Sequence, residues 1–146
     1  YSLKFSVRLN ISSPRIHSYY YTQVLKEIAM IKGIGLDIVE LPRLKNIITR
    51  TPRFVNKVLT MREYEIYQSL KPHRQLEFLG GRFAAKEAYA KALGTGIGEH
   101  CRLHDIEIIA NDLGAPVLYF CNELTSDFIS ITHTEKYAAA QVIILV

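Results

Sequence analysis

Residues 80–98 read GGRFAAKEAYAKALGTGIG, and the interpretation of the whole chain starts from this stretch. An advance of about 100° per residue, the helical period, predicts that it belongs to a long helix over residues 73–93. On that helix Glu87 falls about 20° from Leu76, inside an apolar stripe. A glutamate in such a place is costly unless it is paired, protonated or bound to a metal. The other members of the stripe, all within about 60° of Leu76, are Leu79, Phe83 and Ala90.

Two interpretations of Glu87 remain open at this point. The residue can lie at the edge of the helix and pair with Lys91 one turn later, or it can face a functional site. Gly80 and Gly81 lower the helix propensity but permit close packing. Gly94 is a natural left-handed cap, so the helix is expected to end there.

Shorter elements are expected before the long helix. Residues 31–41 read as a strand, and Pro42 suits the first turn of a helix that runs to about Arg50. A short helix follows Thr51-Pro52. Thr60 and Glu63 form a capping-box signature, which predicts a third helix from residue 61 to about residue 69.

The last third of the chain is rich in β-strand signals. Residues 105–110 and 116–121 flank an Asn-Asp-Leu-Gly turn and predict a hairpin. Two more strands are expected over residues 128–132 and 138–146. The fold class is therefore α+β: an N-terminal strand and helices, including one long central helix, packed on an antiparallel sheet.

The net charge of +4 is concentrated at the start of the chain. Residues 1–29 hold Lys4, Arg8, Arg15 and Lys26 against Glu27 alone, which leaves a net charge of +1 for the rest. A near-neutral body argues against a dedicated nucleic-acid binder, and no apolar run approaches the length of a membrane span. We interpret residues 1–29 as an N-terminal extension, with a non-native origin left open, and residues 30–146 as one domain.

Asp37 interrupts an otherwise apolar strand and is the natural partner of Glu87. Alternation along a strand places it on the same side as Gly35 and Val39, and the glycine is expected to leave room beside the carboxylate. A solvent-facing aspartate at a strand end is the plainer interpretation. Two carboxylates on two core elements suit Mg²⁺ with phosphate oxygens, but they also suit glycoside hydrolysis.

The cations of the long helix favour a metal–phosphate site. Lys91 lies one turn beyond Glu87, and Arg82 and Lys86 are expected on adjacent faces. The glycine-rich residues 94–98 follow a helix instead of opening one, so they are weak evidence for a phosphate cradle. His133 near a strand end is most often structural, and Cys101 and Cys121 lack metal-ligand spacing and weakly suggest a reducing compartment.

Three blocks of the chain resemble the holo-(acyl-carrier-protein) synthases, the short bacterial-type 4′-phosphopantetheinyl transferases. The blocks are residues 33–40 (GIGLDIVE), 77–98 (EFLGGRFAAKEAYAKALGTGIG) and 129–134 (ISITHT). The resemblance covers residues 30–146, in the right order and with plausible spacing. The family usually reads Leu-Ala-Gly-Arg-Phe where this chain has Leu79-Gly80-Gly81-Arg82-Phe83, a change that touches no proposed ligand.

The resemblance implies a phosphopantetheinyl transferase-like fold and a cytoplasmic enzyme of fatty acid and lipid biosynthesis. Such an enzyme moves the 4′-phosphopantetheine arm of coenzyme A to a serine of acyl carrier protein and releases adenosine 3′,5′-bisphosphate. The resemblance also implies homotrimers with active sites between protomers. It implies Mg²⁺ on Asp37 and Glu87, with catalysis by Glu87 and Lys91 and carrier docking on Arg43 and Arg53. Coenzyme A contacts are expected from Arg82, Lys91, Gly94, Thr95, Gly96, His133 and Thr134.

Two other functions use the same residues. A Mg²⁺-dependent phosphohydrolase would act on a nucleotide through the two carboxylates without an acceptor protein. A non-catalytic module would bind an acidic helix through Arg43, Arg50 and Arg53 and would need no metal.

Overall fold

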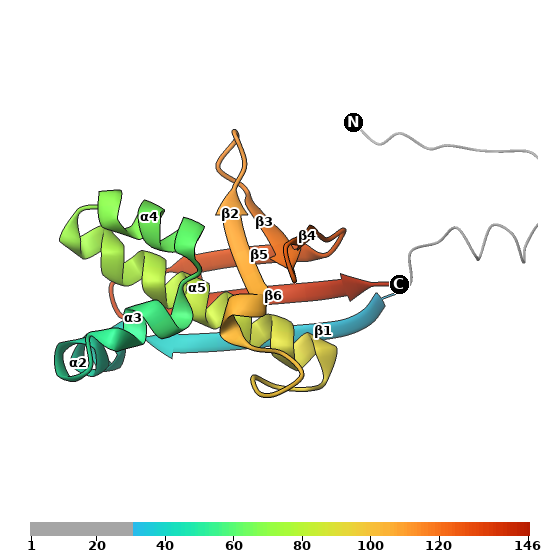
Figure 1. Ribbon diagram of the computed structural model, residues 1–146, viewed down its shortest axis with the longest axis horizontal. Helices are drawn as coiled ribbons and strands as arrows, with labels where there is room; N and C mark the ends of the chain where they lie inside the picture. The colour runs from blue at the N-terminus through green and yellow to red at the C-terminus, as the bar shows by residue number, and fades with distance from the viewer. Residues whose placement is uncertain (1–30) are drawn as a thin grey trace, which may run out of the picture. The chain divides into compact units, whose positions relative to one another are not determined.

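The computed structural model describes residues 31–146, so the N-terminal extension assigned to residues 1–29 lies outside the described residues. The chain runs from strand β1 through four helices to a β-rich second half (Figure 1). The first part consists of β1 (Ile31–Glu40), α2 (Leu41–Arg50), α3 (Arg53–Val58), α4 (Met61–Ser69) and α5 (Pro72–Leu93). The second part consists of a 3₁₀ turn (Leu103–Asp105), β2 (Ile106–Ala110), β3 (Pro116–Phe120), β4 (Glu123–Leu124), β5 (Phe128–His133) and β6 (Tyr137–Leu145).

The strands form two antiparallel sheets, in the orders β1-β6-β5 and β2-β3-β4. Helix α5 packs against β1 and β6 and runs along the first sheet (Figure 1). Alternate residues of β6 face the helix, because successive side chains of a strand point to opposite faces. The buried set of β6 is Ala138, Ala140, Val142 and Ile144. The α+β prediction is therefore confirmed, with two small sheets in place of one.

Two glycines allow α5 to lie unusually close to β1. A Cβ atom at Gly35 would stand 1.8 Å from the carbonyl oxygen of Ala88, and one at Gly33 would stand 2.0 Å from that of Ala92. The expectation that Gly35 leaves room beside Asp37 is wrong, because the helix backbone fills that space. The glycines instead bring the strand and the helix into direct contact, which places Asp37 beside the side chains of α5.

Local signals located most helix ends. Thr60 and Glu63 form the capping box at the start of α4, and Gly94 adopts the left-handed conformation with φ 79° after α5. Six of the predicted strand ends differ from the structure by one residue: both ends of β6, the last residue of β5, and one end of each of β1, β2 and β3. Leu41 is the first residue of α2, Asp105 closes the 3₁₀ turn, and Cys121 follows β3 with φ 52°.

The apolar stripe predicted for α5 is only part of its buried surface. Leu79 and Ala90 are buried, whereas Phe83 and Glu87 are half-buried at the edge of the helix. Lys86, expected on a face adjacent to that of Glu87, is fully buried. Because α5 contacts both sheets and the other helices, it is covered on more sides than one stripe describes.

Candidate active site

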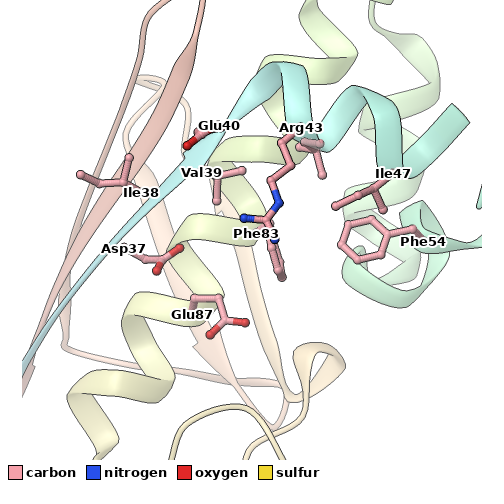
Figure 2. A pocket seen from close by; sticks show the side chains of 10 residues that line it. Asp37, Ile38, Val39, Glu40, Arg43, Ile47, Phe54, Phe83 and Glu87 are labelled. Atoms are coloured by element: carbon pink, nitrogen blue, oxygen red, sulfur yellow. The ribbon is translucent and has the colours of Figure 1, made fainter. Parts of the chain in front are cut away.

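Strand β1 and helices α2, α3 and α5 enclose a cavity of about 410 Å³ at one end of the first sheet (Figure 2). Asp37 and Glu87, the two carboxylates that the sequence analysis paired, both line it. Figure 2 shows the two carboxylates on neighbouring elements, Asp37 from β1 and Glu87 from α5. The rest of the lining consists of Ile38, Val39, Glu40, Arg43, Leu44, Ile47, Phe54 and Phe83.

Lys91 holds Asp37 from the next turn of α5. Its Nζ donates to Asp37 Oδ1 at 2.8 Å and to the carbonyl oxygen of Leu36 at 3.1 Å. The Lys91 side chain is 52% exposed and that of Asp37 is 17% exposed. The lysine therefore pairs with Asp37, and not with Glu87 as the plainer interpretation supposed, and its amine stays accessible to an anion from solvent.

Glu87 lies in an environment that disfavours its negative charge. Burial raises the pKa of its carboxyl above the ordinary value of 4.5, and the nearby charge of Asp37 raises it further. Lys91 acts in the opposite direction and lowers the same pKa. Lys91 forms its ion pair with Asp37, so the negative charge of Glu87 has no ion pair of its own among the described residues.

Helices α2 and α3 supply the opposite wall. The Arg43 side chain reaches into the cavity from α2 near Phe83 (Figure 2). The rings of Phe54 and Phe83 meet edge to face, with centroids 5.5 Å apart. Arg53 is exposed on α3 outside the lining. The sequence analysis missed both phenylalanines as wall residues, because only the tertiary contact between α3 and α5 brings them together.

Arg82 and Lys86 do not line the cavity with Glu87. Arg82 donates from Nε to the carbonyl oxygen of Ile108 at 3.0 Å, and its guanidinium lies 4.1 Å from the centre of the Phe78 ring. Lys86 forms an ion pair with Glu63 in the interior. The prediction that these two cations surround the carboxylates is therefore wrong for Lys86, and Arg82 points toward β2.

The glycine-rich loop uses its amides to finish helix α5. The N–H of Gly94 donates to the Lys91 carbonyl, and the N–H groups of Thr95 and Gly96 donate to that of Ala90. Amides engaged in a helix cap are not available to hold a phosphate. The exposed Thr95 side chain, whose hydroxyl bonds within the loop to the carbonyl of Gly96, is the polar side chain left to meet a ligand.

His133 and Thr134 line a different cavity of about 360 Å³. Its other walls include Ile38, Thr132 and Tyr137, and the cross-strand register places Ile38 and Thr132 on the face of the sheet away from α5. Within one chain the structure does not bring His133 or Thr134 to the cavity of Glu87.

Other predicted chemistry is limited. Cys101 is buried, and burial raises its pKa to about 11, whereas Cys121 is exposed. Among residues 31–146 no cluster of three or more His, Cys, Asp or Glu side chains is arranged to hold a metal ion. No helix in the same part of the chain has the length and the apolar character that a membrane span requires.

Comparison with known proteins places this chain in a family. Residues 33–142 match the 4′-phosphopantetheinyl transferase superfamily. The holo-[acyl-carrier-protein] synthase of Bacillus pumilus is 56% identical over 118 residues, which cover 79% of this chain and 96% of the relative. That of Listeria monocytogenes is 51% identical over 116 residues, which cover 79% and 98%.

Solved structures of the same enzymes share the fold. The holo-(acyl-carrier-protein) synthase from Bacillus anthracis, in complex with CoA (3′,5′-ADP), has a TM-score of 0.72 and 43% identity and covers 80% of this chain and 98% of its own. The Helicobacter pylori synthase in complex with coenzyme A has a TM-score of 0.68 and 29% identity and covers 77% and 99%. This chain therefore belongs to the 4′-phosphopantetheinyl transferase superfamily, within the holo-[acyl-carrier-protein] synthases, which transfer phosphopantetheine from coenzyme A to acyl carrier protein.

Proposed function

We propose that the transfer takes place in the cavity of Asp37 and Glu87 and that Lys91 binds the coenzyme A phosphates there. The observation that carries this proposal is that Asp37 and Glu87 line one cavity and that Asp37 pairs with Lys91, whose side chain is 52% exposed. Here the ammonium group of Lys91 can bind an anionic diphosphate, and the carboxylates of Asp37 and Glu87 can bind a metal ion beside that diphosphate.

The donor set fits Mg²⁺, which takes one or two protein carboxylates and completes its shell with substrate oxygens and water. Asp37 and Glu87 would hold it. The mutual repulsion that raises the pKa of Glu87 is the condition that a divalent cation relieves. When bound, Mg²⁺ supplies positive charge for the oxygens of the reacting diphosphate.

The side chains of this chain then have separate tasks. The serine hydroxyl oxygen of the carrier attacks the β-phosphorus, and the bond from that phosphorus to the bridging oxygen breaks. Adenosine 3′,5′-bisphosphate leaves with the negative charge, which the ammonium group of Lys91 stabilises. Glu87 accepts the serine proton, because it is a carboxylate beside the position where the hydroxyl oxygen forms its new bond.

The carrier protein is proposed to dock beside the cavity on α2 and α3. Carrier proteins are acidic, and Arg43 at the rim and Arg53 on the neighbouring helix offer complementary charge. Docking of this kind is steered by electrostatics and weakens as salt is added.

The outer face of the first sheet supports a homotrimer. Its large apolar side chains are uncovered in a single chain: Ile34, Leu36, Ile38, Phe128 and Tyr137 are each 48% to 63% exposed. An apolar patch of this kind marks an interaction site. His133 and Thr134 lie at the end of this face, where they would contribute to the nucleotide pocket of an adjacent protomer.

The trimer has a direct test. Leu36→Asp buries a charge in the proposed interface, so we expect the protein to sediment as a monomer and to lose transfer activity. The control, Gln68→Asp, adds the same charge to the exposed surface of α4 and should leave the trimer intact. A trimeric Leu36→Asp protein would contradict the proposed interface.

The site has its own test, in which Glu87→Gln is incubated with apo carrier protein, coenzyme A and Mg²⁺ and the carrier is weighed intact. The parent enzyme should add about 340 Da, the phosphopantetheine arm, and the variant should add almost nothing. Near-normal transfer by the folded variant would refute the role of Glu87. Coenzyme A consumed without any gain in carrier mass would instead favour a phosphohydrolase.

We also place the reaction in the cytoplasm, a reducing compartment that suits free Cys101 and Cys121.

A further inference from the structure

A buried ion pair lies on another face of α5, one residue before Glu87. The side chains of Lys86 and Glu63 are both 0% exposed, and Nζ of Lys86 lies 2.7 Å from Oε2 of Glu63. Neither residue lines the active-site cavity. The proposed reaction therefore leaves unexplained why two charges are kept in the interior.

Every N–H of the Lys86 ammonium has its own acceptor. In addition to Glu63, Nζ donates to the carbonyl oxygen of Val58 at 2.6 Å and to that of Leu103 at 2.9 Å. These acceptors come from the end of α3, the first turn of α4 and the 3₁₀ turn before β2. Three directional bonds to three segments fix the position of the ammonium group relative to all of them.

The carboxylate of Glu63 is equally committed. Oε2 also accepts from the backbone N–H of Thr60 at 2.9 Å, and Oε1 accepts from that of Ile108 at 2.8 Å. Among the described residues no buried side-chain nitrogen or oxygen lacks a partner. One carboxylate thus joins the start of α4, the free edge of β2 and helix α5.

We propose that the Glu63–Lys86 pair is a positioning device that aligns Glu87 on α5 with the cavity wall on α3. Lys86 precedes Glu87 directly, so the bonds that fix the lysine also fix the rotation of the helix at the glutamate. The same lysine holds Val58, the last residue of α3, and that helix carries Phe54 into the cavity. The inference rests on the proposed role of Glu87.

A small rotation is enough to matter. A carboxylate about 5–6 Å from the helix axis moves by about 1 Å when the helix turns by about 10°. A misplacement of about 1 Å can lower a rate by about 10²-fold. The apolar contacts of α5 do not prevent such a turn well, because hydrophobic contact is not directional. Apolar side chains of similar volume often replace a buried pair without loss of stability, so stability alone does not account for it.

The experiment uses the double variant Glu63→Gln/Lys86→Met, which removes both charges and leaves no buried charge unpaired. We expect a folded protein whose thermal midpoint stays within about 5 °C of the parent. Its kcat should fall by about tenfold or more while its KM for coenzyme A changes by less than about threefold. Lys91, which binds the phosphates in our proposal, pairs with Asp37 and lies outside the network. A folded double variant with the parental kcat would overturn the proposal.

A second variant decides the question if the double variant does not fold. Glu63→Asp keeps both charges, but its side chain is one methylene shorter. The variant therefore shifts the position of the Lys86 ammonium group without removing the ion pair. A fall in kcat with little change in KM for coenzyme A supports positioning, and an unchanged kcat overturns it. The matched control is Arg62→Met, which removes the ion pair of exposed Arg62 with Glu107 at the same contact of α4 and β2 and should leave kcat unchanged.

Glu87→Gln, assayed beside these variants, separates the two proposals. If that substitution abolishes transfer while the double variant and Glu63→Asp are fully active, the proposed site stands and the positioning inference fails. If Glu87→Gln remains active, the proposed role of Glu87 fails first.

Discussion

Lys86 and Lys91 lie five residues apart on the same helix and each pairs with a carboxylate, but the two pairs differ in solvent exposure and in the other groups that surround them. Lys86 and Glu63 are 0% exposed, and the ammonium is enclosed by three oxygen acceptors. Lys91 is 52% exposed, and its partner Asp37 lines the cavity that we propose as the active site. An enclosed charge serves the fold because nothing from solvent can reach it, and an open charge can exchange its partner for a substrate.

The largest effect on the fold is expected from Lys86→Met alone. The substitution leaves the Glu63 carboxylate buried without its cation and removes the donor to Val58 and Leu103. Breaking such a pair from one side costs about 3–5 kcal/mol. Urea unfolding measures the change in the free energy of unfolding. A loss below about 1 kcal/mol, the range of an exposed ion pair, would remove the distinction between the two lysines.

Lys91→Met should produce the opposite result. Because its ion pair is open to solvent, we expect a loss of at most about 1 kcal/mol of stability. Transfer should fall by about 10²-fold or more, since the variant lacks the charge that we propose stabilises the leaving phosphate. Paired measurements of kcat and urea stability check this, and a marked loss of stability with normal transfer would reverse the roles that we assign.

The smallest expected effect is a pH shift that again separates the two lysines. Burial and Asp37 raise the pKa of Glu87 and Lys91 lowers it, so Lys91→Met should raise that pKa further. Because the carboxyl pKa is higher in the folded than in the unfolded chain, ionisation of Glu87 disfavours folding, and stability from this group decreases as the pH rises through that pKa. A carboxyl NMR titration of the metal-free protein measures the shift. Glu63→Gln/Lys86→Met keeps Asp37 and Lys91, the two charges that act on Glu87, so its shift should be the smaller one, and an equal shift in both variants would contradict the comparison.

The elements that could be predicted from the sequence depend on neighbours within a few residues. The capping box of Thr60 and Glu63 and the left-handed Gly94 were both recognised from spacing, because their hydrogen bonds close within one helical turn. The meeting of Asp37 and Glu87 was also anticipated, from their chemistry and from the resemblance. The role of Gly35 was predicted wrongly. A glycine is needed at this position because the backbone of a helix more than fifty residues later in the chain packs directly against it.

The buried ion pair of Glu63 and Lys86 is the clearest feature that could not be predicted from the sequence. Glu63 was recognised only as a cap and Lys86 only as one of the cations of the long helix, although they are the two charged side chains most completely enclosed among the described residues. No local pattern joins them, since 23 residues separate them. The helical period alone could not find them, because α5 is covered by two sheets and three helices and therefore buries more than one stripe.

The amino-acid sequence by itself determined the order of the elements, the caps of α4 and α5, and the residue types of a transferase site. These follow from backbone sterics and short-range hydrogen bonds, which each segment carries with it. Only the tertiary structure decided which lysine is enclosed and which meets solvent, and that Arg82 turns to β2 while Arg43 reaches the cavity. The burial of a side chain depends on the residues from distant parts of the chain that pack against it. Burial makes the Glu63–Lys86 pair part of the fold, whereas the Asp37–Lys91 pair stays accessible to solvent.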